Sequence, residues 1–103
     1  MTEERANLAA TGSVMLDIGG DVGALVVHVD SPLLGHEVEA RPVAAARRPT
    51  HADVLERQTP HGPLYAVVIS GLIAGRYTVW LDGSHPWGEV EVSAGQVAEL
   101  DRR

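Results

Sequence analysis

The stretch Gly71-Leu-Ile-Ala-Gly-Arg-Tyr-Thr-Val-Trp-Leu-Asp-Gly83, with Gly88-Glu-Val-Glu-Val-Ser-Ala-Gly95 shortly after it, decides the expected fold. It predicts a short loop, a strand, a turn and a second strand. Successive side chains of a strand point to opposite faces, so Tyr77, Val79 and Leu81 are expected to face inward together. Asp-Gly is a strong turn signal, although the interval to Gly88 predicts a loop longer than a two-residue hairpin. This part of the chain is therefore expected to be a β-hairpin.

The rest of the chain continues the same alternation, and no window shows the spacing of an amphipathic helix. Two segments, 24–29 and 64–69, are apolar on both faces and are expected to be buried strands. Segment 50–58 is polar on both faces and is expected to lie at an edge. The sequence predicts a single antiparallel β-sandwich of about seven to eight strands at residues 12–103, after a flexible tail at 1–11. The expected strands are 13–18, 24–29, 36–41, 50–58, 64–69, 77–81, 90–92 and 97–100.

Composition narrows the class of protein. The 103 residues are 45% hydrophobic and 21% charged and contain no cysteine, which indicates an ordinary globular domain without disulfides or thiolate metal sites. The net charge of −6 disfavours binding to nucleic acid and anionic lipid. Without a signal-peptide pattern or a membrane-spanning run, a cytoplasmic protein is expected. The basic pair Arg47-Arg48 is interpreted as a solvated loop, with phosphate binding as the alternative.

A family resemblance covers residues 61–103. The positions that carry it are Gly62, the apolar strand 64–69, Leu72, Gly75, Tyr77, Val79, Gly88, Val90, Val92 and Gly95. At these positions the chain resembles the transthyretin-like, or prealbumin-like, sandwiches, a group that includes carboxypeptidase regulatory-like and collagen-adhesin B-type modules. The resemblance implies a non-catalytic accessory or interaction module.

Catalytic members of related groups do not match at their functional positions. The transthyretin-like hydroxyisourate hydrolases end in Tyr-Arg-Gly-Ser, whereas this chain ends Glu99-Leu-Asp-Arg-Arg103. Intradiol dioxygenases hold iron through two tyrosines and two histidines, and here the alternation places Tyr77 in the core. We therefore expect no enzyme activity and no cofactor.

Five histidines in a short chain raise the question of a metal site. Two of them form His-x-Asp pairs, His28 with Asp30 and His51 with Asp53, and residues two apart on a strand share a face. An imidazole beside a carboxylate could bind a divalent metal if the two strands were adjacent. His61 and His85 could add further ligands from their loops. The alternative interpretation is that these polar residues are simply solvated.

Two tryptophans flank the Asp-Gly loop, and His85 lies within it. Trp80, His85 and Trp87 are the residues expected to form an interaction surface, with packing of Trp80 beneath its own hairpin, or stacking on a sugar, as alternatives. His36 alternates with apolar residues and is expected to be partly buried. The leading functional hypothesis is a protein-interaction or accessory module, including one that self-associates. The alternative is a small metal- or ligand-binding protein.

Overall fold

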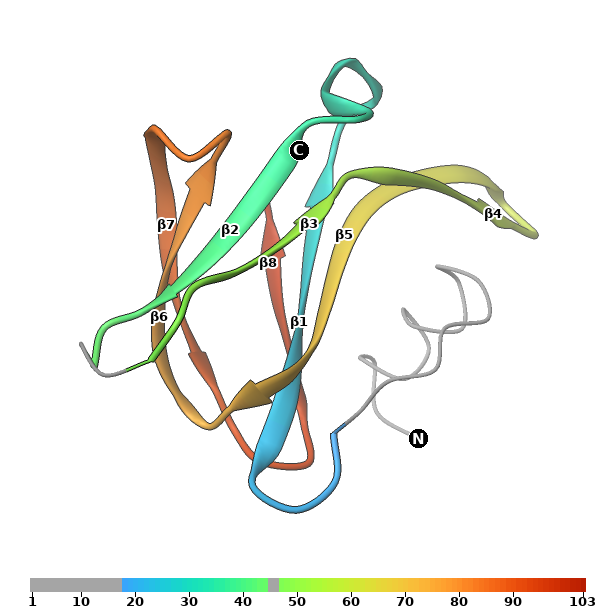
Figure 1. The fold of residues 1–103 in the computed structure, drawn as a ribbon. Coiled ribbons are helices and arrows are strands. Elements are labelled where there is room, and N and C mark those ends of the chain that lie inside the picture. The colour runs from blue at the N-terminus through green and yellow to red at the C-terminus, as the bar shows by residue number, and fades with distance from the viewer. Residues whose placement is uncertain (1–17, 45–46) are drawn as a thin grey trace.

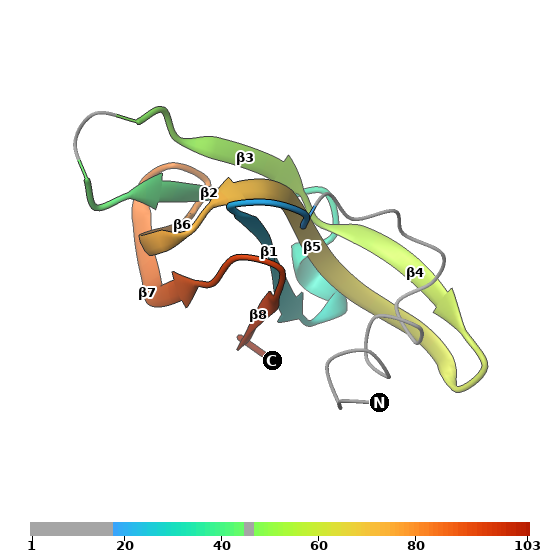
Figure 2. The same ribbon diagram turned by 90° about the horizontal axis from the view of Figure 1, so that it is seen from below.

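The computed structural model describes residues 18–44 and 47–103, and the tail and first strand expected at 1–11 and 13–18 lie outside them, apart from Ile18. Within this part of the chain, eight strands form two four-stranded sheets packed face to face (Figures 1 and 2). Sheet 1 has the order β4-β5-β1-β8 and sheet 2 the order β3-β2-β6-β7. The elements are β1 (Val22–Val29), η1 (Ser31–Leu33), β2 (Glu37–Pro42), β3 (Thr50–Asp53), β4 (Leu55–Thr59), β5 (Gly62–Ile73), β6 (Gly75–Leu81), β7 (His85–Val92) and β8 (Val97–Asp101).

The all-β sandwich-like architecture expected from the alternation is confirmed, but the sheets are not both antiparallel. Strand β8 pairs with β1 in parallel, with Ala24 opposite Val97 and His28 opposite Asp101. A tight hairpin forces its two strands to be antiparallel, but no hairpin joins β1 and β8. The chain leaves β7 in sheet 2 and enters sheet 1 through the turn at residues 93–96. Sheet 1 is therefore a mixed sheet, which alternation alone does not reveal.

The edge segment 50–58 is two strands and not the single strand expected from the sequence. Val54 interrupts it, with its side chain fully buried, its N–H donated to the His36 carbonyl at 2.8 Å and its carbonyl accepting from the Gly35 N–H at 3.0 Å. Strand β3 before it is an edge of sheet 2, and β4 after it is an edge of sheet 1. The apolar side chain of Val54 enters the core where the chain passes from one sheet to the other.

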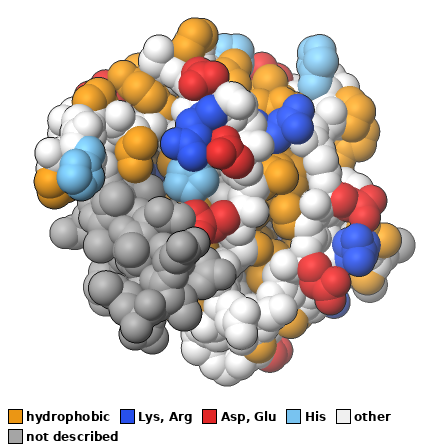
Figure 3. Space-filling model, turned by 180° about the vertical axis from the view of Figure 1, so that it is seen from behind, with side chains coloured by type: hydrophobic (Ala, Val, Ile, Leu, Met, Phe, Trp, Pro, Cys, Tyr) orange, Lys and Arg blue, Asp and Glu red, His pale blue; other side chains and the backbone are white. Residues whose placement is uncertain are grey.

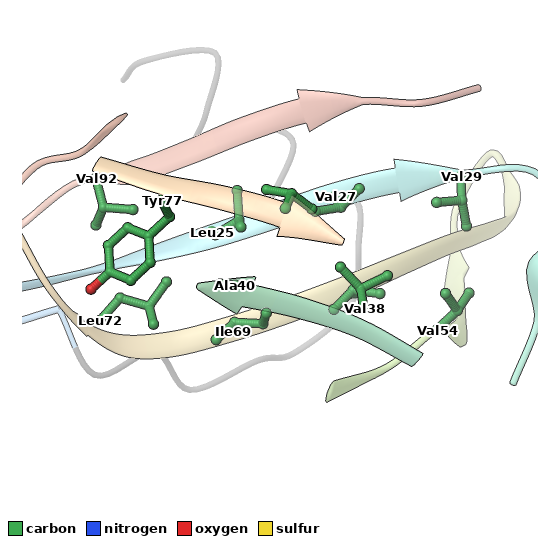
Figure 4. Packing of buried hydrophobic residues seen from close by; sticks show 12 residues of the cluster. Leu25, Val27, Val29, Val38, Ala40, Val54, Ile69, Leu72, Tyr77 and Val92 are labelled. Carbon is green, nitrogen blue, oxygen red and sulfur yellow. The ribbon is translucent and has the colours of Figure 1, made fainter. Parts of the chain in front are cut away.

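The core lies between the sheets and contains the residues that alternation assigned inward (Figure 4). Tyr77, Val79 and Leu72 are buried, and Leu81 packs against them. The Tyr77 hydroxyl donates a hydrogen bond to the Ile73 carbonyl at 2.6 Å, so the one polar atom of this buried ring is satisfied. Burial of each large apolar side chain contributes about 1.5–3 kcal/mol to folding.

The loop of the β6–β7 hairpin is longer than two residues, as expected, but it ends well before Gly88. Strand β7 begins at His85, so the loop is only Asp82 to Ser84, with Asp82 and Gly83 both at positive φ. At the other side of the molecule, the β4–β5 hairpin extends away from the sandwich (Figures 1 and 2). Among the described residues, no helix is long and apolar enough to cross a membrane.

Candidate functional site

A hollow lies on the face of sheet 1 that is turned away from the core, where β1 and β8 end. It has a volume of about 260 Å³ and is lined by His28, Leu64, Glu99, Asp101 and Arg103. The parallel pairing of β1 and β8 creates it, because Glu99 lies opposite Val26 and Asp101 opposite His28. We call these five lining residues the β8 groove.

The floor of the β8 groove is His28. Its side chain is buried, and its Nε2 lies 2.7 Å from Oε1 of Glu99. Its Nδ1 is hidden from solvent and has no hydrogen-bond partner in the described structure. A buried imidazole beside a half-buried carboxylate is held in one orientation by that hydrogen bond, and removing the carboxylate would leave a second ring nitrogen unsatisfied.

The rim of the β8 groove is an ion pair between the last residues of β8 and the chain after it. Arg103 donates to Asp101 from Nε and Nη2, each at 3.0 Å, and its backbone N–H donates to the same carboxylate. These hydrogen bonds hold the pKa of Asp101 well below its ordinary value. The pKa of Arg103 is raised, first by Asp101 and further by the nearby charges of Asp30 and Glu99. The Arg103 guanidinium is thus bound by Asp101 and is also attracted by Glu99 in the groove and by Asp30 in the chain next to it.

A second hollow of about 560 Å³ adjoins the groove, sharing Leu64 and Arg103 with it. Its other lining residues come from the end of β1, from η1 and from the start of β5 and are Val29, Asp30, Ser31, Pro32, Pro63 and Tyr65. On the face seen in Figure 3, acidic, basic and histidine side chains lie close together beside a run of hydrophobic side chains. The two hollows together are lined by charged groups and by the apolar side chains of Val29, Pro32, Pro63 and Leu64.

The two His-x-Asp pairs do not meet. His28 and Asp30 belong to the β1 end of sheet 1, whereas His51 and Asp53 lie on β3, the edge of sheet 2. His51 Nδ1 is instead 3.2 Å from Oε2 of Glu37. Across residues 18–44 and 47–103, no group of three or more His, Asp or Glu side chains is placed to hold a metal ion. The condition that the two strands be adjacent is therefore not met.

The remaining histidines are also separate. His36 is partly buried, as expected, and its Nδ1 lies 2.7 Å from Oδ2 of Asp82. His61 and His85 are both exposed and lie in the β4–β5 and β6–β7 hairpins, which point to opposite sides of the molecule (Figures 1 and 2).

Trp80, His85 and Trp87 do not share a face either. Trp80 lies on the outer side of sheet 2, where its Nε1 donates to Thr78 and the Arg41 guanidinium covers its ring at 4.0 Å. Trp87 is partly buried and packs against the core. Only His85 is exposed. The ring of Trp80 is thus covered by Arg41 from the neighbouring strand β2.

Sequence reasoning missed Glu99, Asp101 and Arg103. Alternation on the last strand does place Glu99 and Asp101 on one face, and that signal was available. What it lacks is the partner strand, because the parallel register with β1 is what brings both carboxylates beside His28.

Comparisons with protein-family models, with curated proteins and with solved structures each find no match for this chain.

Proposed function

We propose that this chain is a non-enzymatic β-sandwich module that binds another protein and that its β8 groove receives a basic side chain of that partner. The observation that carries the proposal is the way in which Asp101 binds Arg103. Its guanidinium is bound through two nitrogens by Asp101, with Asp30 and Glu99 close enough to add attraction. Bidentate carboxylate binding is the geometry by which proteins recognise arginine.

Arg103 is easily displaced from the Asp101 carboxylate. The side chains of Arg103 and Asp101 are about half exposed, at 47% and 58%, and exposed ion pairs are weak because water and salt screen them. A partner's arginine can therefore take the place of Arg103 at small cost, while its aliphatic stem and neighbours cover Leu64 and the adjoining hollow. The net charge of −6 attracts basic partners over longer distances.

We also propose that the chain is a transthyretin-like sandwich. The residues at 61–103 that resemble transthyretin-like sandwiches support membership of that group, whose modules are mostly accessory or interaction domains. Self-association is one form of the proposed activity, because a second copy carries the same Arg103. A cytoplasmic location completes the proposal.

The test uses a short fluorescent peptide with three arginines, titrated with the protein at low salt and followed by anisotropy. Asp101→Asn is expected to weaken binding about two- to fivefold, the usual effect of one exposed ion pair. Arg103→Ala is expected to strengthen peptide binding, because the Asp101 carboxylate is then free to bind an arginine of the peptide. Asp53→Asn is the matched control: it removes the same charge from an exposed site on β3 and should leave binding nearly unchanged.

Two results would oppose the proposal. If Asp101→Asn and Asp53→Asn weaken the peptide equally, binding reflects net charge and the β8 groove has no special role. If Arg103→Ala weakens binding, Arg103 helps to hold the partner and is not displaced by it. Light scattering over a concentration series separates self-association from capture of a different protein.

A further inference from the structure

A second charged region lies at the opposite end of the sandwich from the β8 groove. Two cavities meet there, with volumes of about 240 and 310 Å³, and both are lined by Arg47 and Pro42. The smaller also contains Arg48 and Thr50, and the larger contains Arg76. None of the described residues lining either cavity is acidic, which is unusual in a chain with a net charge of −6.

Arg47 is the central residue of this region. Its side chain is partly buried, and its Nη1 is hidden from solvent and has no hydrogen-bond partner among residues 18–44 and 47–103. Its guanidinium lies over the backbone of Gly75, since a Cβ at Gly75 would be 3.7 Å from both terminal nitrogens. A shielded cation without a counter-ion is costly, and a buried polar atom without a partner calls for an explanation such as a bound ion.

The neighbouring arginines differ in what they can offer a ligand. Arg76 is already neutralised by Glu89 at 2.8 Å and Glu91 at 3.4 Å. Arg47 and Arg48 have no ion pair in the described part of the chain. The smaller cavity therefore presents two uncompensated positive charges to one small volume.

We propose that Arg47 and Arg48 bind the phosphate group of a small phosphomonoester. A phosphate monoester carries about −1.5 to −2 charges at neutral pH, which matches two guanidinium groups, and its oxygens accept bidentate hydrogen bonds from arginine. Thr50 lines the same cavity with a hydroxyl donor. The larger cavity, with Val43 and Ala44 beside Pro42, accommodates the apolar organic part of the ester.

The ligand is a small molecule because a polyanion does not fit the rest of the protein. Nucleic acid and anionic membranes present many phosphates, and binding them requires an extended basic surface. Here the two free arginines are confined to one end of an acidic protein, whose other charges would repel a long polyanion. The proposal is independent of the β8 groove, which lies at the other end of β1.

The experiment is isothermal titration calorimetry with phenyl phosphate, inorganic phosphate and benzoate at constant ionic strength. Phenyl phosphate is expected to bind most tightly, because its phosphate can face Arg47 and Arg48 while its ring enters the larger cavity. Arg47→Gln is expected to raise its dissociation constant about tenfold or more, the effect of losing charge-assisted hydrogen bonds. Arg48→Gln, at an exposed position, is expected to act in the same direction and keeps the test valid if Arg47→Gln folds poorly.

Arg102→Gln is the matched control, since it removes one positive charge at the far end of β1, where the Arg102 N–H donates to the His28 carbonyl. It should leave phenyl phosphate affinity unchanged. Failure of the wild-type protein to bind phenyl phosphate would overturn the proposal, as would equal weakening by Arg102→Gln and Arg47→Gln. Equal affinity for benzoate would overturn the assignment to phosphate, and equal affinity for inorganic phosphate would overturn the assignment to an ester.

Discussion

The close approach of the β7–β8 turn to β1 allows a sharp test of the mixed sheet. Gly23 lies on β1 directly beneath this turn. A Cβ built on Gly23 would overlap the Ser93 carbonyl oxygen and would lie 2.8 Å from the Gln96 carbonyl and 2.9 Å from a methyl of Val92. Two of these three neighbours are backbone atoms, which cannot rotate away as a side chain does. The Gln96 carbonyl also accepts the Ala24 N–H at 3.0 Å, so moving it weakens the sheet.

The expected effect of Gly23→Ala combines two opposing terms. Forcing a methyl group into a filled space costs about 1–3 kcal/mol. Replacing glycine by alanine recovers about 0.4–1 kcal/mol, because the unfolded chain loses freedom. A net loss of about 1–2 kcal/mol in the free energy of unfolding remains, and at about 4–8 °C per kcal/mol it lowers Tm by roughly 4–16 °C.

Urea denaturation and a thermal melt measure the change. The control is Gly19→Ala, because a Cβ at Gly19 meets nothing within 4 Å and Gly19 does not have positive φ. That variant should stay within about 0.5 kcal/mol of the wild type. If Gly23→Ala is as stable as Gly19→Ala, the turn does not cross over β1 as described, and the parallel β1–β8 register is wrong.

Three further predictions concern the groove and the core. Glu99→Ala should lower the free energy of unfolding by about 1–3 kcal/mol in urea denaturation, because buried His28 loses the acceptor for its Nε2; unchanged stability would show that the pair adds nothing. The pKa of Asp101, followed by carboxyl carbon NMR, should lie below its ordinary value of 3.8 and return toward it in Arg103→Ala. Because the pKa of Asp101 is lowered in the folded state, the stabilisation from the Asp101–Arg103 pair is complete above the ordinary pKa and is lost as the pH falls through the folded-state pKa. A titration midpoint of 3.8 for Asp101 in the wild type would contradict this prediction. Tyr77→Phe should cost about 0.5–1.5 kcal/mol in a thermal melt by removing a buried hydrogen bond to a main-chain carbonyl, and a neutral result would show that bond to be unimportant.

The β8 groove illustrates the limit of sequence reasoning at the candidate site. The pairing of His28 with Asp30 was visible as a spacing of two along a strand. Its real partner is Glu99, which is 71 residues away, and nothing in local alternation specifies which strand will lie beside β1 or in which direction. Contacts between distant segments depend on the order and orientation of strands, and these are decided by the packing of the whole sandwich.

The β6–β7 hairpin, which contains Trp80, shows the same limit of sequence reasoning. The sequence correctly placed Tyr77 and Val79 inward and Trp80 outward, because a strand turns successive side chains to opposite faces. It could not show that Arg41 from neighbouring β2 would cover the outer ring of Trp80. An outward position therefore did not mean an available surface.

The sequence by itself determined most of the strands among the described residues and which of their side chains face the core, since period-two alternation and turn residues act locally. It correctly identified strand β1 as central, because a segment apolar on both faces is stable only where both faces are covered. The tertiary structure alone decided that β8 runs parallel to β1 and that Val54 divides one edge segment between two sheets. It also decided that Arg47 has no counter-ion within the part of the chain that the structure describes. These features arise from long-range packing, in which each strand's neighbours are chosen by the fit of all the others.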